Sequence, residues 1–193
     1  PETMSHALTR RDFVAGTAAL GAVALARPAF AQNSPNWRVA YFSDSHILTD
    51  RLVSENRVVL EEIMTHRPDF LINGGDIVDS GWESEYRNWK SMTADLGAPA
   101  YAVPGNHDVR WSRFDADLFE KYCGPRRQLI SRKGVHFLLL DSTCPLSHWG
   151  HFGADDLAWI KRTLDPIPPE EPVFVFAHHW MGRERVVVDN ELT

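Results

Sequence analysis

The sequence predicts a layered α/β fold built around largely parallel strands. Five short runs rich in β-branched and aromatic residues recur along the chain, and stretches with helical periodicity lie between them. Each run ends in a side chain that can bind a metal or move a proton. Because ligands bind outside the carboxyl ends of parallel strands, these polar groups are expected to gather at one edge of the sheet.

The predicted strands each end in polar residues. They are WRVAYFSDSH, ending in Asp44 and His46; PDFLINGGD, ending in Asp76; PAYAVPGNHD, ending in Asn106, His107 and Asp108; VHFLLLDS, with Asp141; and PVFVFAHH, with His178 and His179. Asp44 and His46 alternate, so an extended segment would present both side chains on one side. Gly74 and Gly75 allow a tight turn before Asp76. Asp79 is interpreted as a helix cap or as a group beside the ligands rather than as a ligand.

Four helices are predicted between these strands. Their apolar faces are Val59, Leu60 and Ile63; Tyr86, Trp89 and Met92, closed by Gly97; Phe114, Leu118 and Tyr122; and Leu157, Ile160 and Leu164. Ser112 with Asp115 resembles a capping box for the third helix.

The first 31 residues are interpreted as an export signal. Arg10 and Arg11 precede a small-residue apolar stretch, and an Ala-x-Ala site ends at Ala31. The opening resembles the twin-arginine class, so we expect the twin-arginine export machinery as a partner and a periplasmic or secreted protein. The apolar stretch is too short for a stable membrane anchor. Residues 32–193 then form one domain.

Composition narrows the class of partner. The chain has 193 residues, 44% of them hydrophobic, and a net charge of −6. An acidic surface argues against nucleic acid as the main partner. Cys123 and Cys144 are too few for a disulfide scaffold, and we interpret them as buried thiols. The hypothesis of an exported redox protein is disfavoured, because the sequence has no CxxC, nucleotide-binding or haem motif.

The polar strand ends predict a metal site. Crowded carboxylates repel one another and cost free energy unless a cation neutralises them. Oxygen and nitrogen donors without thiolate suit Zn, Mn or Fe better than Ca. Zn and Mn act without redox chemistry, which favours Lewis-acid hydrolysis.

These motifs, in this order and rough spacing, resemble those of the calcineurin-like metallophosphoesterases. The run GGDIVDSG…YAVPGNHD is most similar to the class III cyclic-nucleotide phosphodiesterase branch. The resemblance covers about residues 37–180. It implies an α/β/β/α sandwich with the metal site at the carboxyl ends of the strands, and hydrolysis of a small phosphodiester or phosphomonoester.

The resemblance also implies a role for each site residue. Asp44 and His46 would bind one metal ion, Asn106 and His178 the other, and Asp76 would bridge the two. A hydroxide held between the ions would attack phosphorus. His107 would act as the acid, with Asp108 orienting its ring. His179 would line the site.

One family element has no match in the sequence. The pattern ends in Gly-His-x-His, whereas the last histidine here is His179, so we interpret the chain as truncated and without its final strands. The alternative is a protein of the same fold that binds metal or phosphate without turnover. Arg183 and Arg185 could bind a substrate phosphate, but basic residues on a loop more often simply face solvent. For His148, Trp149 and His151 a structural role is preferred to a substrate contact.

Overall fold

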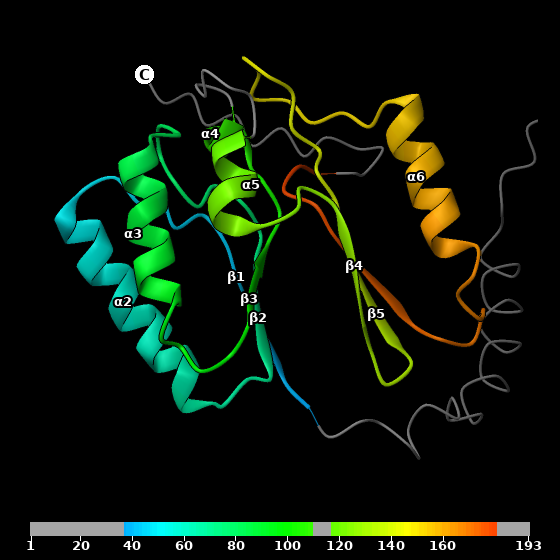
Figure 1. Ribbon diagram of the computed structural model, residues 1–193, viewed down its shortest axis with the longest axis horizontal. Helices are drawn as coiled ribbons and strands as arrows, with labels where there is room; N and C mark the ends of the chain where they lie inside the picture. The colour runs from blue at the N-terminus through cyan, green and yellow to red at the C-terminus, as the bar shows by residue number, and fades with distance from the viewer. Residues whose placement is uncertain (1–36, 110–116, 181–193) are drawn as a thin grey trace, which may run out of the picture. The chain divides into compact units, whose positions relative to one another are not determined.

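A computed structural model describes residues 37–109 and 117–180 of the chain (Figure 1). The chain divides into two units, Pro1–Asn36 and Trp37–Thr193, and all the described residues lie in the second. The expected export signal, the Ser112–Asp115 capping box, Arg183 and Arg185 lie outside the described residues.

The first sheet is entirely parallel. Its strands are β1 (Val39–Phe42), β2 (Phe70–Asn73) and β3 (Ala100–Ala102), in the order β1-β2-β3. Helices α2 (Asp50–Thr65) and α3 (Glu83–Thr93) connect the strands and cover the same outer face (Figure 1). All four residues of β2 are buried, as expected for a central strand covered on both faces.

The second sheet is mixed. It contains β4 (Gln128–Arg132), β5 (Val135–Leu139) and β6 (Val173–Phe176), with β4 antiparallel and β6 parallel to β5. Sequence analysis missed β4, whose ends are polar. Lys133 and Gly134 both have positive φ, at 51° and 75°, which is the geometry of the tight turn that joins twisted hairpin strands. Helix α6 (Ala154–Leu164) lies on the outer face of this sheet (Figure 1).

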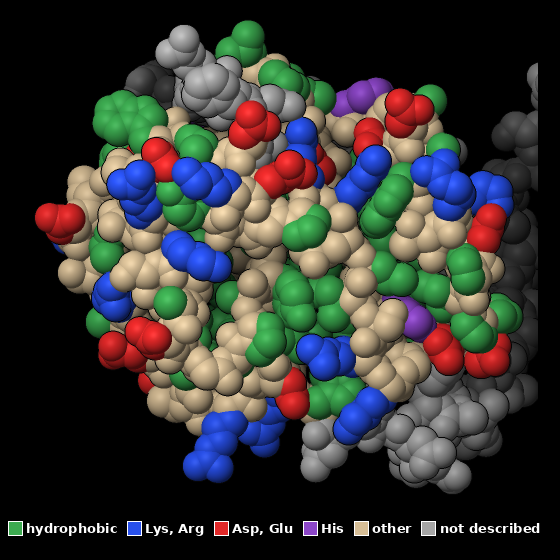
Figure 2. Space-filling model, viewed as in Figure 1, with side chains coloured by type: hydrophobic (Ala, Val, Ile, Leu, Met, Phe, Trp, Pro, Cys, Tyr) green, Lys and Arg blue, Asp and Glu red, His purple; other side chains and the backbone are tan. Residues whose placement is uncertain are grey.

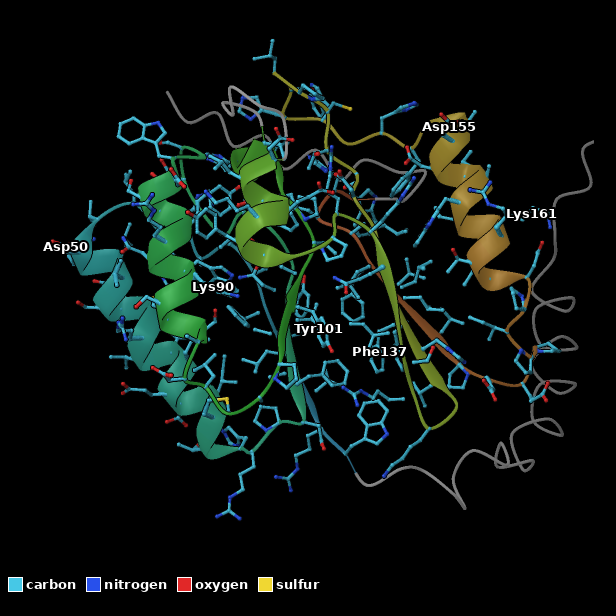
Figure 3. All side chains as sticks on the ribbon, in the orientation of Figure 1. Asp50, Lys90, Tyr101, Phe137, Asp155 and Lys161 are labelled. Carbon is cyan, nitrogen blue, oxygen red and sulfur yellow. The ribbon has the colours of Figure 1, made fainter. Side chains whose placement is uncertain are left out.

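The two sheets face each other across an aromatic core, which confirms the predicted α/β/β/α sandwich. The ring of Phe137 lies 5.1 Å from that of Phe70 and 5.3 Å from that of Trp37, both in edge-to-face contact. Tyr101 and Phe137 both lie in the space between the sheets in Figure 3. A second core lies between the first sheet and its helices.

Helical periodicity predicted the packing of α3 better than that of α2 and α6. Tyr86, Trp89 and Met92 of α3 are buried as expected. In α2, Leu60 is buried but Val59 is 50% exposed, so the two do not share a buried face. Leu157 of α6 is 57% exposed, and α6 has no buried residue. Helix α6 therefore covers its sheet only partly in the described part of the chain.

Two short helices follow the first sheet. Helix α4 (Asn106–Val109) begins three residues after Val103, and α5 (Asp117–Cys123) packs against α3. None of the helices in the described residues is long and apolar enough to cross a membrane. On the face drawn in Figure 2, acidic and basic side chains are intermingled over the described surface.

Candidate metal centre

Three of the expected ligands lie just beyond the ends of β1 and β2 in an unusual backbone conformation. Asp44, His46 and Asp76 have φ values of 58°, 41° and 50°. Residues other than glycine rarely adopt positive φ, and those that do cluster at functional sites. The expectation that Asp44 and His46 continue an extended strand is therefore wrong: hydrogen bonds from Asp44 N–H to Gly75 O and from His46 N–H to Asp76 O hold a turning segment.

The first group of possible metal donors contains Asp44, Asp76 and His178, whose ligand atoms all lie within 4.8 Å of one another. His178 Nε2 is 3.3 Å from an oxygen of Asp76. Its other nitrogen, Nδ1, lies 2.9 Å from the carbonyl oxygen of Gly74, which can only accept a hydrogen bond. Nδ1 therefore carries a proton, and Nε2 faces the carboxylates, where it is available to a metal ion.

The second group contains His46, Asp76 and His107, again within 4.8 Å. The rings of His46 and His107 meet edge to face at 4.7 Å. His46 Nδ1 lies 3.2 Å from Asp79 Oδ1, and His107 Nδ1 lies 2.6 Å from the backbone oxygen of Asp79. Both rings thus donate from Nδ1 and keep Nε2 for the site. Asp79 lies beside the ligands, one of the two positions expected for it.

Asp76 belongs to both groups, as a bridging carboxylate must. Its Oδ1 accepts a hydrogen bond of 2.8 Å from His107 N–H, and its side chain is almost completely buried. The backbone must come very close here: a Cβ on Gly105 would lie 2.2 Å from Asp76 Oδ1, and one on Gly75 would lie 2.7 Å from His178 Nδ1. Glycine is required at both positions.

The charges at the site are strongly coupled. Burial by itself would raise the pKa of Asp76, but the hydrogen bond and charge of His178, with the N–H of His107, lower it. Burial opposes the charged form of His178, yet Asp76 raises the pKa of that imidazole to about 9. The positive charge of protonated His178 thus balances the Asp76 carboxylate, and a bound metal ion would balance the same charge.

Asn106 and Asp108 enter the site in different ways. Asn106 is buried at the start of α4, between Gly105 and His107. Asp108 does not orient the ring of His107, which is a correction to the expectation above. Its buried carboxylate accepts backbone hydrogen bonds from Gly105, Ile77 and Val78, and it therefore ties the loop after β2 to the loop after β3.

Two other strand ends differ in what they contribute. Asp141 after β5 pairs with Arg126 and with the backbone of Thr143, and it is not part of either donor group. His179 lies beside His178, as expected, with ring centroids 5.1 Å apart. Sequence analysis missed Ser142, whose buried hydroxyl contacts His179. The only signal for it was its position after a strand-ending Asp.

A cavity of about 480 Å³ lies between α5 and α6. Its lining includes His151 and two ion pairs, Arg126 with Asp141 and Arg127 with Asp156. His148 and His151 are both exposed. Each of these two arginines is already paired with a carboxylate. A phosphate in this cavity would therefore have to compete with Asp141 or Asp156 for them.

The donor set fits divalent cations. Two overlapping groups of three oxygen and nitrogen donors share one buried carboxylate, and the ligand histidines are oriented by second hydrogen bonds. A two-layer sheet sandwich with such a site at the carboxyl ends of its strands defines the class of binuclear metallohydrolases.

Comparison with known proteins places the chain within that class. A model of the calcineurin-like phosphoesterase family matches residues 38–191, and the chain belongs to this family. The family-level resemblance found in the sequence is thus confirmed.

Similar proteins include bacterial phosphodiesterases. The chain is 27% identical over 169 residues to a probable glycerophosphodiester phosphodiesterase of Arcobacter nitrofigilis, covering 79% of this chain and 61% of that protein. It is 27% identical over 159 residues to a cAMP/cGMP dual specificity phosphodiesterase of Mycobacterium tuberculosis, covering 75% and 50%. The chain therefore spans about half to three fifths of the length of these relatives.

Solved structures support the fold. A dimetal phosphatase from Danio rerio superposes with a TM-score of 0.57 at 15% identity, covering 75% of this chain and 70% of that one. A purple acid phosphatase from yellow lupin gives a TM-score of 0.51 at 17% identity, covering 78% and 31%.

Proposed function

We propose that this protein hydrolyses small phosphodiesters with two divalent metal ions. The observation that carries the proposal is the sharing of Asp76 between two donor groups, because one carboxylate that reaches both can hold two ions close together. Relatives named as cAMP/cGMP and glycerophosphodiester phosphodiesterases support a small-molecule phosphodiester, rather than the polymer of a nucleic acid, as substrate.

We assign the ligands as the sequence motifs imply. Asp44 and His46 would hold one ion, Asn106 and His178 the other, and Asp76 would serve both; Mn, Fe or Zn would suit these donors. The structure adds that His178 also lies within reach of Asp44, and His107 within reach of His46, around the shared Asp76. When bound, they supply Lewis acidity to the phosphate and to an attacking water. The chain itself orients the imidazoles through Asp79 and the Gly74 carbonyl, and it keeps Asp76 ionised.

His107 is proposed to protonate the leaving oxygen. Its Nδ1 is held 2.6 Å from the backbone oxygen of Asp79, which fixes the ring and directs Nε2 toward the donor groups. Its backbone N–H simultaneously holds Asp76. A positioned acid of this kind contributes roughly 10²–10⁴-fold to the rate.

The test is hydrolysis of bis-p-nitrophenyl phosphate by the full chain with Mn²⁺. Wild type should turn over, Asp76→Asn should lose at least about 10³-fold, in line with removal of a group central to charge stabilisation, and Asp95→Asn should match wild type. Asp95 is an exposed residue after α3 and serves as the matched control. Mn²⁺ binding by a folded chain without turnover would favour a binding protein instead.

The export proposal has its own test. We propose that Arg10 and Arg11 direct the protein through the twin-arginine machinery to the periplasm or the exterior. Replacing both by Lys should leave the protein inside a bacterial host. Export that is unchanged in this variant would contradict the proposal.

A further inference from the structure

Ser142 follows the end of β5 and contacts His179, which follows the end of the neighbouring strand β6. Its side chain is buried, with the residue 1% exposed. Its hydroxyl oxygen lies 2.8 Å from Nδ1 of His179, and it also accepts the backbone N–H of His179 at 3.3 Å. One hydroxyl thus holds both the ring and the backbone of the residue next to His178.

The segment after Ser142 closes around the same imidazole. His151 N–H donates to the backbone oxygen of Ser142 at 2.9 Å. A Cβ on Gly150 would lie 2.4 Å from Cβ of His179, an atom that cannot rotate away. Gly150 therefore lets the segment pack directly against His179.

His179 in turn packs against His178. The two rings meet at 87°, with centroids 5.1 Å apart, so the edge of one lies on the face of the other. His178 has Gly74 O at Nδ1 and Asp76 at Nε2. These contacts hold the two nitrogens, and the ring of His179 adds an edge-to-face contact with the same imidazole.

We propose that Ser142, acting through His179, is a positioning residue for the metal centre: it holds the His178 ring in the orientation that directs Nε2 toward Asp44 and Asp76. Gly150 serves the same end by making room for His179. The inference rests on the proposed function only in taking His178 as a metal ligand. Loss of a partner that orients a ligand typically weakens metal binding 10–100-fold.

The chain offers a control with the same serine–imidazole hydrogen bond, at a serine that is exposed rather than buried. Ser131 Oγ lies 2.8 Å from Nδ1 of His136, the same bond at the same length, in the hairpin of β4 and β5. The residues of this pair belong to neither donor group. Ser131→Ala therefore removes an equivalent hydrogen bond without touching the metal centre.

The experiment is a titration of the full chain with Co²⁺, followed by the visible absorption of the bound ion. Ser142→Ala should weaken one of the two binding events about 10–100-fold and change its absorption band, because the His178 ring is no longer held. Ser131→Ala should titrate like wild type. Equal titrations for Ser142→Ala and Ser131→Ala would overturn the proposal.

A second pair of variants covers the case in which Ser142→Ala does not fold. Gly150→Ala should weaken the same binding event, whereas Gly153→Ala, whose Cβ would meet only an Asp156 oxygen at 3.6 Å, should not. His179→Phe keeps a ring but offers no ring nitrogen to the Ser142 hydroxyl, so adding Ser142→Ala to it should weaken binding much less than Ser142→Ala does alone. Fully additive losses would show that Ser142 does not act through His179.

The outcomes separate this proposal from the proposed function. Two Co²⁺ bound without hydrolysis of the phosphodiester would contradict the activity and leave the Ser142 comparison intact. Turnover that depends on Asp76, with no difference between the serine variants, would contradict the positioning role alone. A folded wild-type chain that binds no Co²⁺ would overturn both.

Discussion

Asp76 shows how single residues determine the chemistry of this site. Its carboxylate is buried, which alone would favour the neutral form, yet two histidines and a backbone N–H keep its pKa low. His178 responds in the opposite direction, with a pKa of about 9. The ionised carboxylate can therefore bind a cation. If Nε2 of His178 joins it as a ligand, that nitrogen must first lose its proton, whereas Nδ1 keeps the proton that it donates to the Gly74 oxygen.

Asp79 holds two histidines of the site through different atoms. Asp79→Ala removes the carboxylate that holds His46 Nδ1 but keeps the backbone oxygen that holds His107. We expect about a 10–100-fold loss in Mn²⁺ affinity, because an unheld imidazole must be ordered when it binds. Isothermal titration measures the loss, with Asp95→Ala as the control. Unchanged affinity in Asp79→Ala would mean that Asp79 does not orient His46.

At the scale of elements, polar side chains tie together loops and helices that are distant in sequence. Asp108 after β3 accepts hydrogen bonds from Ile77 and Val78 after β2, so the two loops that carry Asp76 and Asn106 are joined. Burial raises the pKa of Asp108 to about 7, against the effect of its backbone donors. Its role is to hold the loops rather than to turn the ring of His107.

Glu83 links α3 to α5 and gives the element-scale prediction. Its Oε1 accepts hydrogen bonds of 2.7 Å from Lys121 and 2.6 Å from Tyr122, and these lower its pKa from 4.5 to about 2. A lowered acid pKa stabilises the fold above the unfolded value, and that stability is lost as pH falls through the folded value. The stability that Glu83 contributes is therefore lost as the pH falls from 4.5 to about 2.

Glu83→Gln should lower the melting temperature slightly at pH 6 and less at pH 3. The effect is small because the carboxylate is partly exposed and solvent screens its charge. Thermal melts at both pH values measure it, beside Glu61→Gln on the exposed face of α2. A Glu83→Gln deficit that is as large at pH 3 as at pH 6 would rule out the carboxylate as its source.

At the scale of the whole described molecule, the two sheets are one folding unit because they share an aromatic core. Phe137 of β5 contacts Phe70 of β2 and Trp37 before β1. The donor groups draw on both sheets, since His178 follows β6 and the other ligands follow β1 to β3. The packing of the sheets therefore decides whether the metal centre exists.

Phe137→Ala should destabilise the protein by about 3–5 kcal/mol, since it empties a buried aromatic position. Val175→Ala on β6, where the side chain is 45% exposed, should cost less than about 1 kcal/mol. Urea unfolding followed by tryptophan fluorescence compares the two, and a single transition is expected in both. Equal costs, or separate transitions for the two sheets, would contradict a shared core.

The strand ends and the donor types could be predicted from the sequence, because apolar runs that stop at Asp, His or Asn are visible without any coordinates. The sequence thereby predicted the α/β class, the family, and the approach of Asp44, His46, Asp76, His107 and His178. Helical periodicity identified the buried face of α3 but misplaced Val59 of α2 and Leu157 of α6, because burial depends on what packs against a helix.

The groups that orient the site histidines became visible only in the folded chain. The partners of His46, His107 and His178 are Asp79 and the Gly74 carbonyl, and Asp108 holds backbone instead. The contact between Ser142 and His179 joins residues 37 positions apart. Such contacts depend on how two sheets pack and where φ turns positive, and neither follows from residue type or local spacing.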